Sequence, residues 1–175
     1  PYIAYAILRI PLPLTIMQIL AIDLGTDILP GLALGAEKPT KEVMKQPPRS
    51  PKERLLNIKI LLRVFLLLGP LEAMAGLFGY FYVLNSGGWQ LAESLPANNI
   101  LYMQATTACL TGIVLAQVAN GFVSRSFRES VFSLGVFSNK LLLVGILFEI
   151  ILQIFIVYHP LGNSIFSTYP IPLNV

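Results

Sequence analysis

Four long apolar stretches constrain this chain more than any other feature of its sequence. They cover about residues 12–35, 58–84, 100–123 and 140–158. A helix needs about 20 mostly apolar residues to cross the hydrocarbon core of a bilayer. Residues 1–8 (PYIAYAIL) have the character of the last turns of a further helix. The pattern predicts an all-α membrane protein, a bundle of about four full transmembrane helices preceded by the end of another one.

The small share of charged residues supports the same class. Charged residues make up 12% of the 175 residues, whereas a soluble domain carries about 25%. The net charge of +3 does not indicate nucleic-acid binding, because the basic residues lie in the connections between apolar stretches. Cys109 is the only cysteine, so no internal disulfide can form. Pro1 begins inside an apolar run with no basic leader segment, and we expect the chain to be a piece of a longer protein.

Lysine and arginine are confined to alternate connections. Residues 37–57 contain six of them, and residues 124–139 contain two, with Lys140 next to them. Residues 85–99 and 159–175 contain none. The positive-inside rule therefore predicts that 37–57 and 124–139 are cytoplasmic and that the other two segments lie outside. We expect residues 159–175, which hold three prolines and show no helical pattern, to be an external loop.

Three polar residues near the centre of the first stretch are the strongest candidates for chemistry. Asp23, Thr26 and Asp27 are spaced i, i+3, i+4, which places them on one face of an α-helix. A carboxylate in mid-membrane costs about 2.5 to 3.5 kcal/mol on insertion scales, and it persists where it faces protein or a wet cavity. Carboxylate and hydroxyl oxygens suit sodium, potassium, calcium, magnesium or protons. We therefore predict that these three residues bind a transported cation.

The surrounding sequence favours a helix that is broken at this point. Gly25 and the Pro30–Gly31 pair weaken the helix and free carbonyl oxygens that can coordinate an ion. The structural alternative is that the aspartates cap the broken helix or pair with Arg9.

Further polar residues lie in the later stretches. Glu149 and Gln153, at i and i+4, form a second polar patch, in which a protonated, hydrogen-bonded glutamate fits as well as an ion ligand. Gln117 and Asn120 are uncharged, and residues of this kind commonly join helices by hydrogen bonds. Glu72 follows a Gly-Pro pair that predicts a kink, and we expect it to satisfy backbone groups freed there. We find no catalytic or cofactor-binding motif and expect no enzymatic activity from this chain alone.

Several of these residues also resemble a known family. The segment from Pro11 to Arg49 contains DLGTD, then a P-x-x-A-L run, an acidic residue and M-K-x-P-P-R. In this order the features resemble the sixth transmembrane helix and following loop of P-type cation-transporting ATPases, the group of sodium/potassium, proton/potassium and calcium pumps. AQVAN (116–120) and LFE (147–149) resemble parts of the eighth and ninth helices.

The resemblance implies a domain organisation for the whole chain, the C-terminal transmembrane domain of such a pump. Residues 1–8 would end the fifth helix and 12–35 would be the sixth. The seventh, eighth and ninth helices would be 58–84, 100–123 and 140–158, followed by the external loop 159–175. ATP and magnesium would bind to domains absent from this chain. Its partners would be the lipid bilayer, the remaining N-terminal helices and the cytoplasmic domains.

The resemblance also implies roles for individual residues. Asp23, Thr26 and Asp27 would be ion ligands of the sixth helix, and Gln117 and Glu149 match positions linked to ion binding. Sodium/potassium members carry aspartate where this chain has Asn120, which calls into question a site that depends on that charge. Asp23 matches the sodium/potassium pattern, which favours monovalent cations over calcium, although the transported ion could be sodium, potassium, calcium or a proton. The alternative class is a stand-alone helical channel, a secondary transporter or an accessory membrane subunit.

Overall fold

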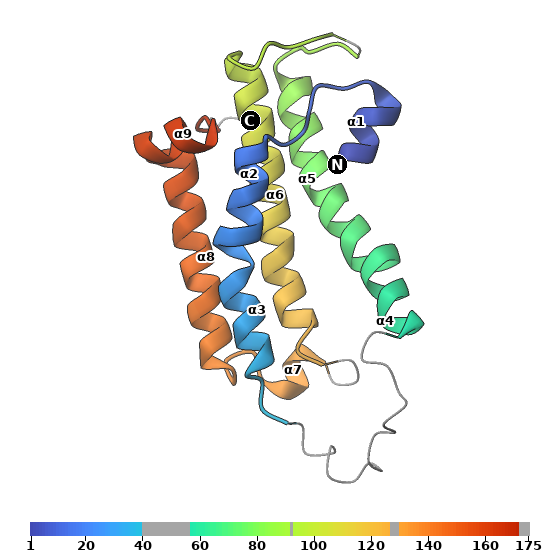
Figure 1. Ribbon diagram of the computed structural model, residues 1–175, viewed down its shortest axis with the longest axis vertical. Helices are drawn as coiled ribbons and strands as arrows, with labels where there is room; N and C mark the ends of the chain where they lie inside the picture. The colour runs from blue at the N-terminus through green and yellow to red at the C-terminus, as the bar shows by residue number, and fades with distance from the viewer. Residues whose placement is uncertain (40–56, 92, 127–129, 172–175) are drawn as a thin grey trace.

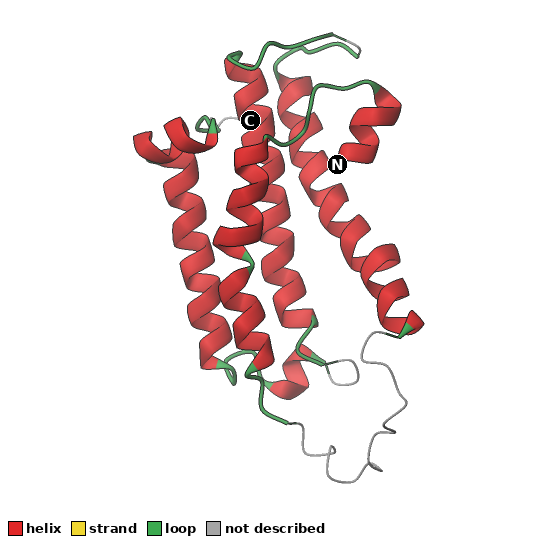
Figure 2. Cartoon of the chain, in the orientation of Figure 1, coloured by secondary structure: helices red, strands yellow, loops and turns green. Residues whose placement is uncertain are grey.

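The computed structural model describes residues 1–39, 57–91, 93–126 and 130–171, and within these ranges it is helical with no strand. The figures show a bundle of long, roughly parallel and antiparallel helices joined by loops (Figures 1 and 2). The elements are α1 (Tyr2–Leu8), α2 (Ile16–Leu20), the π-helical segment η1 (Ala21–Thr26), α3 (Ile28–Gly35), α4 (Ile58–Arg63), the π-helical segment η3 (Val64–Leu68), α5 (Gly69–Ser86), α6 (Ile100–Val123), α7 (Val131–Leu134), α8 (Lys140–Tyr158) and α9 (Pro160–Phe166).

Four of the helical runs are long and apolar enough to cross a membrane. They are Ile16–Gly35, Ile58–Ser86, Ile100–Val123 and Lys140–Tyr158, which confirms the prediction of about four full transmembrane helices. The first span begins at Ile16 rather than near residue 12, because Thr15 and Gln18 form a reciprocal capping box that starts the helix there. The chain is therefore an all-helical, multi-pass membrane protein.

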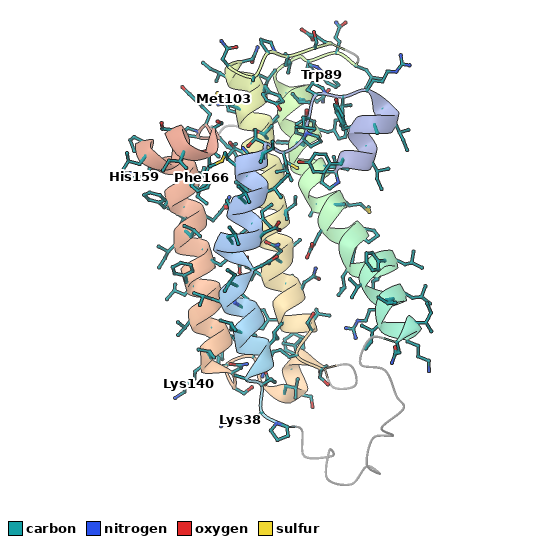
Figure 3. All side chains as sticks on the ribbon, in the orientation of Figure 1. Lys38, Trp89, Met103, Lys140, His159 and Phe166 are labelled. Carbon is teal, nitrogen blue, oxygen red and sulfur yellow. The ribbon has the colours of Figure 1, made fainter. Side chains whose placement is uncertain are left out.

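The spans alternate in direction, so the connections fall at two opposite ends of the bundle. The end of α3 and the starts of α4 and α8 lie at one end, and the connections after α5 and α8 lie at the other (Figure 1). Lys38 and Lys140 lie at the first end, whereas Trp89 and His159 lie at the second (Figure 3). Both basic connections thus begin at the same end of the bundle. Residues 40–56 and 127–129, which belong to these connections, lie outside the described part of the chain. The arrangement agrees with the alternation that the charge pattern predicts.

The helices α5 and α6 form a tightly packed antiparallel hairpin. A side chain at Gly112 would lie 2.6 Å from the carbonyl oxygen of Ala75, and one at Gly79 would lie 2.8 Å from that of Ala108. Only small residues allow two helix backbones to approach this closely, as is common between membrane helices. The hairpin therefore fixes α5 against the bundle, although only a small part of the span Ile58–Ser86 is buried.

Three tyrosine hydroxyls hold the turn that leads into the first span. Tyr80 donates to the carbonyl of Pro11 at 2.8 Å, Tyr102 to that of Leu12 at 2.9 Å, and Tyr2 to that of Leu14 at 3.2 Å. These carbonyls precede the first helical turn and have no helical partners of their own. The N-terminal half of the first span is consequently anchored to both α5 and α6.

The segment after the last span differs from the prediction. Residues 159–175 were expected to lack helix, but Pro160–Phe166 form α9. Pro160 is in the first turn, where its missing N–H costs nothing, and the His159 ring nitrogen Nδ1 accepts a hydrogen bond from the amide of Leu161. The proline that argued against a helix is thus the residue that starts it.

Candidate cation-binding site

The first span is interrupted at its centre by a π-helical turn. The amide of Asp27 donates to the carbonyl of Ile22 at 3.1 Å, one residue further back than in an α-helix. Pro30 has no N–H, so it cannot donate to the carbonyl of Thr26 four residues earlier. The backbone therefore departs from the α-helical pattern at the residues that the sequence singled out. This confirms the predicted broken helix.

The break separates Thr26 from the two aspartates. Asp23 and Asp27 are exposed in this chain, whereas Thr26 is 1% exposed. The Oγ1 atom of Thr26 lies 3.0 Å from the carbonyl oxygen of Ile22 and 3.3 Å from Oε1 of Gln117, two acceptors for its one proton. The expectation that all three residues share one face was wrong for Thr26, because the wider π turn rotates it toward α6. The site therefore has an exposed part with the two carboxylates and a buried part with the hydroxyl.

The structure contains neither of the two structural alternatives for the aspartates, a helix cap or an ion pair with Arg9. Asp27 occupies the N-cap position of α3, but its side chain makes no capping hydrogen bond. Arg9 follows α1, and within the described residues it forms no ion pair with Asp23 or Asp27. Both carboxylates remain available for a ligand.

An open groove runs along α3 beside the two carboxylates. A side chain added at Gly31 or Gly35 would meet no atom within 4 Å, so the described part of the chain leaves this face of α3 uncovered. Two uncovered carboxylates in mid-membrane are costly unless protein, water or a cation compensates them. The groove is lined by Asp23, Asp27, Ile28, Gly31, Leu32, Gly35 and Ala36.

A second group of polar side chains lies inside the bundle, between α6 and α8. Glu149 is 1% exposed and Gln153 is 8% exposed. Within the described residues, Oε1 of each has no hydrogen-bond partner, although Nε2 of Gln153 donates to Oγ1 of Thr111 at 2.9 Å. Buried acceptors without a donor are costly, so these two oxygens are candidates for a bound cation or proton.

Thr111 was not singled out from the sequence. The signal for it is a run of hydroxyl residues on α6, Thr106, Thr107 and Thr111. Thr106 Oγ1 also accepts a hydrogen bond at 3.2 Å from Nε2 of Gln18, which is fully buried in α2. The hydroxyl groups of α6 therefore pair with polar side chains from both the first and the last span.

A third polar contact joins α5 to α6. Nδ2 of Asn120 donates to Oε1 of Glu72 at 2.6 Å. The sequence analysis expected Glu72 to satisfy backbone groups freed by the kink at Gly69–Pro70. Instead, the preceding turn η3 is π-helical, and the Gly69 amide bonds back to the carbonyl of Val64. The carboxylate of Glu72 is thus left to contact Asn120.

The C-terminal end of the first span is fixed by an ion pair that the sequence analysis did not predict. Arg125 donates from Nε to Oε2 of Glu37 at 2.9 Å and from Nη2 to Oε1 at 2.8 Å. Asn139 donates to the same carboxylate at 2.7 Å and to the carbonyl of Ala33 at 3.1 Å. The hydrogen bond from Arg125 holds the pKa of Glu37 below its ordinary value, and the same contact raises the pKa of Arg125. We call these three side chains, Glu37, Arg125 and Asn139, the inner clasp.

The donor set that results consists of oxygen atoms. Carboxylate, hydroxyl and amide oxygens favour hard cations, and they suit zinc or copper poorly. Within the described residues, no three histidine, cysteine or acidic side chains are grouped closely enough to hold a metal ion. The arrangement resembles part of a transport site, in which one span supplies some of the ligands.

Comparison with known proteins shows what the chain is similar to. The family model described as "Cation transporting ATPase, C-terminus" matches residues 11–175. The chain is 31% identical to the sodium/potassium-transporting ATPase subunit alpha-4 of Homo sapiens and 32% identical to subunit alpha-1 of Catostomus commersonii, in each case over 99% of this chain. It is 32% identical to the alpha subunit of Hydra vulgaris over 94% of this chain.

The chain is much shorter than these relatives. It spans 19% of the human and Catostomus proteins and 18% of the Hydra protein. The similarity is therefore to one region of each relative, and it includes all four membrane spans.

Proposed function

Because the chain belongs to the family of C-terminal regions of cation-transporting ATPases, we propose that it binds the transported ion within a P-type pump. The chain is the transmembrane part of such a pump, and its four spans agree with that role. In this proposal the pump moves a hard cation across the membrane, and ATP is hydrolysed by domains outside this chain.

The observation that carries the proposal is the π-helical break beside two unpaired carboxylates. Asp23 and Asp27 bring two negative charges to the centre of a span, and neither is neutralised by a described basic residue. A broken helix with free oxygens is the usual way in which transporters coordinate cations at the middle of the bilayer. We assign the two aspartates as ligands in the exposed part of the site and Thr26 as a ligand in its buried part.

The inner polar group extends this site toward α8. Gln117 contacts Thr26, and Glu149 carries a buried oxygen without a described partner. We assign Gln117 and Glu149 as further cation ligands. This assignment gives the unsatisfied oxygen of Glu149 a binding partner.

The remaining partners of the site follow from the uncovered groove along α3. The groove would be covered by the other helices of the same pump, because lipid cannot solvate the two carboxylates. ATP and magnesium would bind in its cytoplasmic domains and supply the energy for transport. The acid at Asp23 and the sodium/potassium relatives favour a monovalent cation as the substrate.

Transport by the full-length protein tests this function. The intact polypeptide would be purified and reconstituted in sealed vesicles, and uptake of sodium, potassium, calcium and protons would be followed with and without ATP. We expect cation movement that requires ATP and that needs about tenfold more cation or worse when Asp27 is changed to asparagine. ATP-independent flux would instead indicate a channel or a secondary transporter, a class that the comparisons do not favour.

A further inference from the structure

Glu149 lies on the side of α8 that packs against the break in the first span. Gly145, Glu149 and Leu152 are spaced i, i+4 and i+7, so they share one side of the helix. A Cβ atom at Gly145 would lie 3.0 Å from the backbone nitrogen of Pro30. Two turns further along α8, Cδ2 of Leu152 would lie 2.9 Å from a Cβ atom at Gly25. Glu149 lies between these two contacts and therefore at the level of the π-helical turn.

Gln153 follows Glu149 by one turn of α8, and both side chains are buried. Side chains at i and i+4 of a helix have Cβ atoms about 5 to 6 Å apart. Each of the two carries an Oε1 atom that makes no hydrogen bond to a described residue. Leaving two buried acceptors without a donor is costly. The two oxygens thus form a pair of acceptors beside the break that calls for a positively charged partner.

The direction of the Gln153 amide is set by Thr111 on α6. The Thr111 hydroxyl has one proton, and Oγ1 donates it to the carbonyl of Thr107 at 2.9 Å. The hydroxyl can therefore only accept from the amide, and Nε2 of Gln153 donates to it at 2.9 Å. Because the amide nitrogen faces Thr111, the amide oxygen is turned away from it. The contact thus holds Oε1 of Gln153 in a fixed direction and leaves it without a donor.

A second glutamine–threonine pair in the same bundle has no free oxygen. Nε2 of Gln18 donates to Oγ1 of Thr106 at 3.2 Å, and this hydroxyl donates to the carbonyl of Met103 at 3.0 Å. Oε1 of Gln18, however, accepts from the amide of Thr15 at 3.1 Å. The two pairs make the same bridging hydrogen bonds and differ in the oxygen. Joining α6 to a neighbouring helix therefore does not account for the unsatisfied oxygen of Gln153.

We propose that Gln153 is a ligand of the transported cation, binding it through Oε1 together with Glu149, and that Thr111 is the residue that positions this oxygen. The inference rests on the proposed function, which assigns Glu149 to the site. Amide and carboxylate oxygens both favour hard cations. The amide adds a ligand without adding a charge, so the single charge of Glu149 is balanced by one monovalent cation.

The test uses the full-length pump and its cation-dependent ATPase activity, titrated with sodium and with potassium. Gln153→Met keeps the length of the side chain and removes the oxygen, and Thr111→Val removes the hydroxyl that orients it. For at least one of the two cations, we expect each variant to raise the concentration for half-maximal activity about three- to tenfold, with maximal turnover within about twofold of the wild type. Thr111→Ser, which keeps the hydroxyl, should restore the affinity to within about twofold of the wild type.

Thr106→Val is the matched control, because it makes the same change in the glutamine–threonine pair whose oxygen has a donor. It should lower the melting temperature in detergent as Thr111→Val does, but it should leave the cation affinity at the wild-type value. The melting temperature is also recorded with and without the cation, because a ligand that binds the folded state raises it. This rise should be smaller in Thr111→Val than in Thr106→Val, which separates weakened binding from a loosened bundle.

A wild-type cation affinity in Gln153→Met would overturn the inference, because Gln153 would then only join two helices. An equal loss of affinity in Thr106→Val would also overturn it, since the effect would then come from loosening α6. If Gln153→Met does not fold, Thr111→Val and Thr111→Ser decide, and equal affinities in these two would contradict the inference. Asp27→Asn, measured alongside, separates the two proposals. If it too keeps the wild-type affinity, the proposed cation site is wrong, and if only Gln153→Met does so, the inference about Gln153 is wrong.

Discussion

Arg125 binds Glu37 through two hydrogen bonds of 2.9 and 2.8 Å, one to each carboxylate oxygen, and thereby ties the C-terminal end of α3 to the end of α6. The guanidinium makes further contacts, because Nη1 donates to the carbonyl of Gly135 at 2.9 Å, and Nη2 also contacts the hydroxyl of Ser138. The side chain of Arg125 is 0% exposed and that of Glu37 is 19% exposed. The first span is thus fixed at its C-terminal end, beyond the π-helical break.

The inner clasp makes a prediction about stability and pH. Glu37→Gln removes the charge that pairs with buried Arg125, and we expect it to lower the free energy of unfolding at pH 7 by about 1 to 3 kcal/mol. The folded state depresses the pKa of Glu37 from its ordinary value of 4.5. The stabilisation is therefore present above about pH 4.5 and is lost as the pH falls through the lower folded-state pKa.

Thermal unfolding in detergent at several pH values measures this effect. The difference between wild type and Glu37→Gln should be largest near neutral pH and should shrink below pH 4.5. Arg125→Lys is the companion variant, because lysine keeps the charge but loses the two-pronged geometry. A difference that stayed constant from pH 7 to pH 3 would contradict the role of the Glu37 charge.

Gly145 is predicted to control how closely α8 packs against α3. A Cβ atom at this position would lie 3.0 Å from the backbone nitrogen of Pro30 and 3.1 Å from the carbonyl carbon of Leu29. Backbone atoms cannot move aside as a flexible side chain can, so we expect Gly145→Ala to cost about 1 to 3 kcal/mol and to weaken cation activation. Gly121→Ala is the matched control, because its Cβ would be 3.8 Å from Leu142, an ordinary contact. Equal melting temperatures for the two variants would contradict this packing.

The direction of insertion can be tested with single cysteines on intact cells. Ser133 and Ser86 are both exposed, and they lie in α7 and at the end of α5, at opposite ends of the bundle. The positive-inside rule predicts that a membrane-impermeant thiol reagent labels Ser86→Cys and labels Ser133→Cys only after permeabilisation. The native Cys109 is fully buried and should give no background. Labelling of Ser133→Cys alone on intact cells would show that the topology is the reverse of the predicted one.

The chain by itself should neither hydrolyse ATP nor form a phosphoenzyme. Its sequence contains no glycine-rich phosphate loop and no segment that resembles the phosphorylation motif DKTGT of the family. Purified chain incubated with radiolabelled ATP should give no acid-stable phosphoprotein, whereas the full-length pump under the same conditions should. A labelled band from the chain alone would show that catalytic groups had been missed.

The fold was largely predictable because membrane spans are defined by composition over about 20 residues. Local chemistry within the spans was less predictable. Gly25 and the Pro30–Gly31 pair indicated a broken helix, but they did not indicate that the break is a π-helical turn that rotates Thr26 away from the aspartates. The pattern of prolines after residue 159 was misread, because Pro160 starts a helix rather than preventing one.

Contacts between distant segments could not be predicted from the sequence. Glu37 and Arg125 are 88 residues apart, and Glu72 and Asn120 are 48 residues apart. Each residue had an ordinary interpretation by itself, as a charge in a connection or a polar residue at a kink. Only the packing of α3, α5, α6 and α8 makes them partners.

The central claim, that the broken first span binds the transported cation through its two aspartates, is tested most directly by cation-dependent ATPase activity of the full-length pump. Asp23→Asn and Asp27→Asn each remove a charge and keep the side-chain shape, and Glu93→Gln is the control outside the spans. A buried charge-assisted contact is worth about 1.5 to 3 kcal/mol, so each aspartate variant should need about tenfold more cation or worse. Asn120→Ala, which leaves all the acids in place, should have a smaller effect. If both aspartate variants kept wild-type cation affinity and turnover at normal abundance, the aspartates would be structural and the account would be wrong.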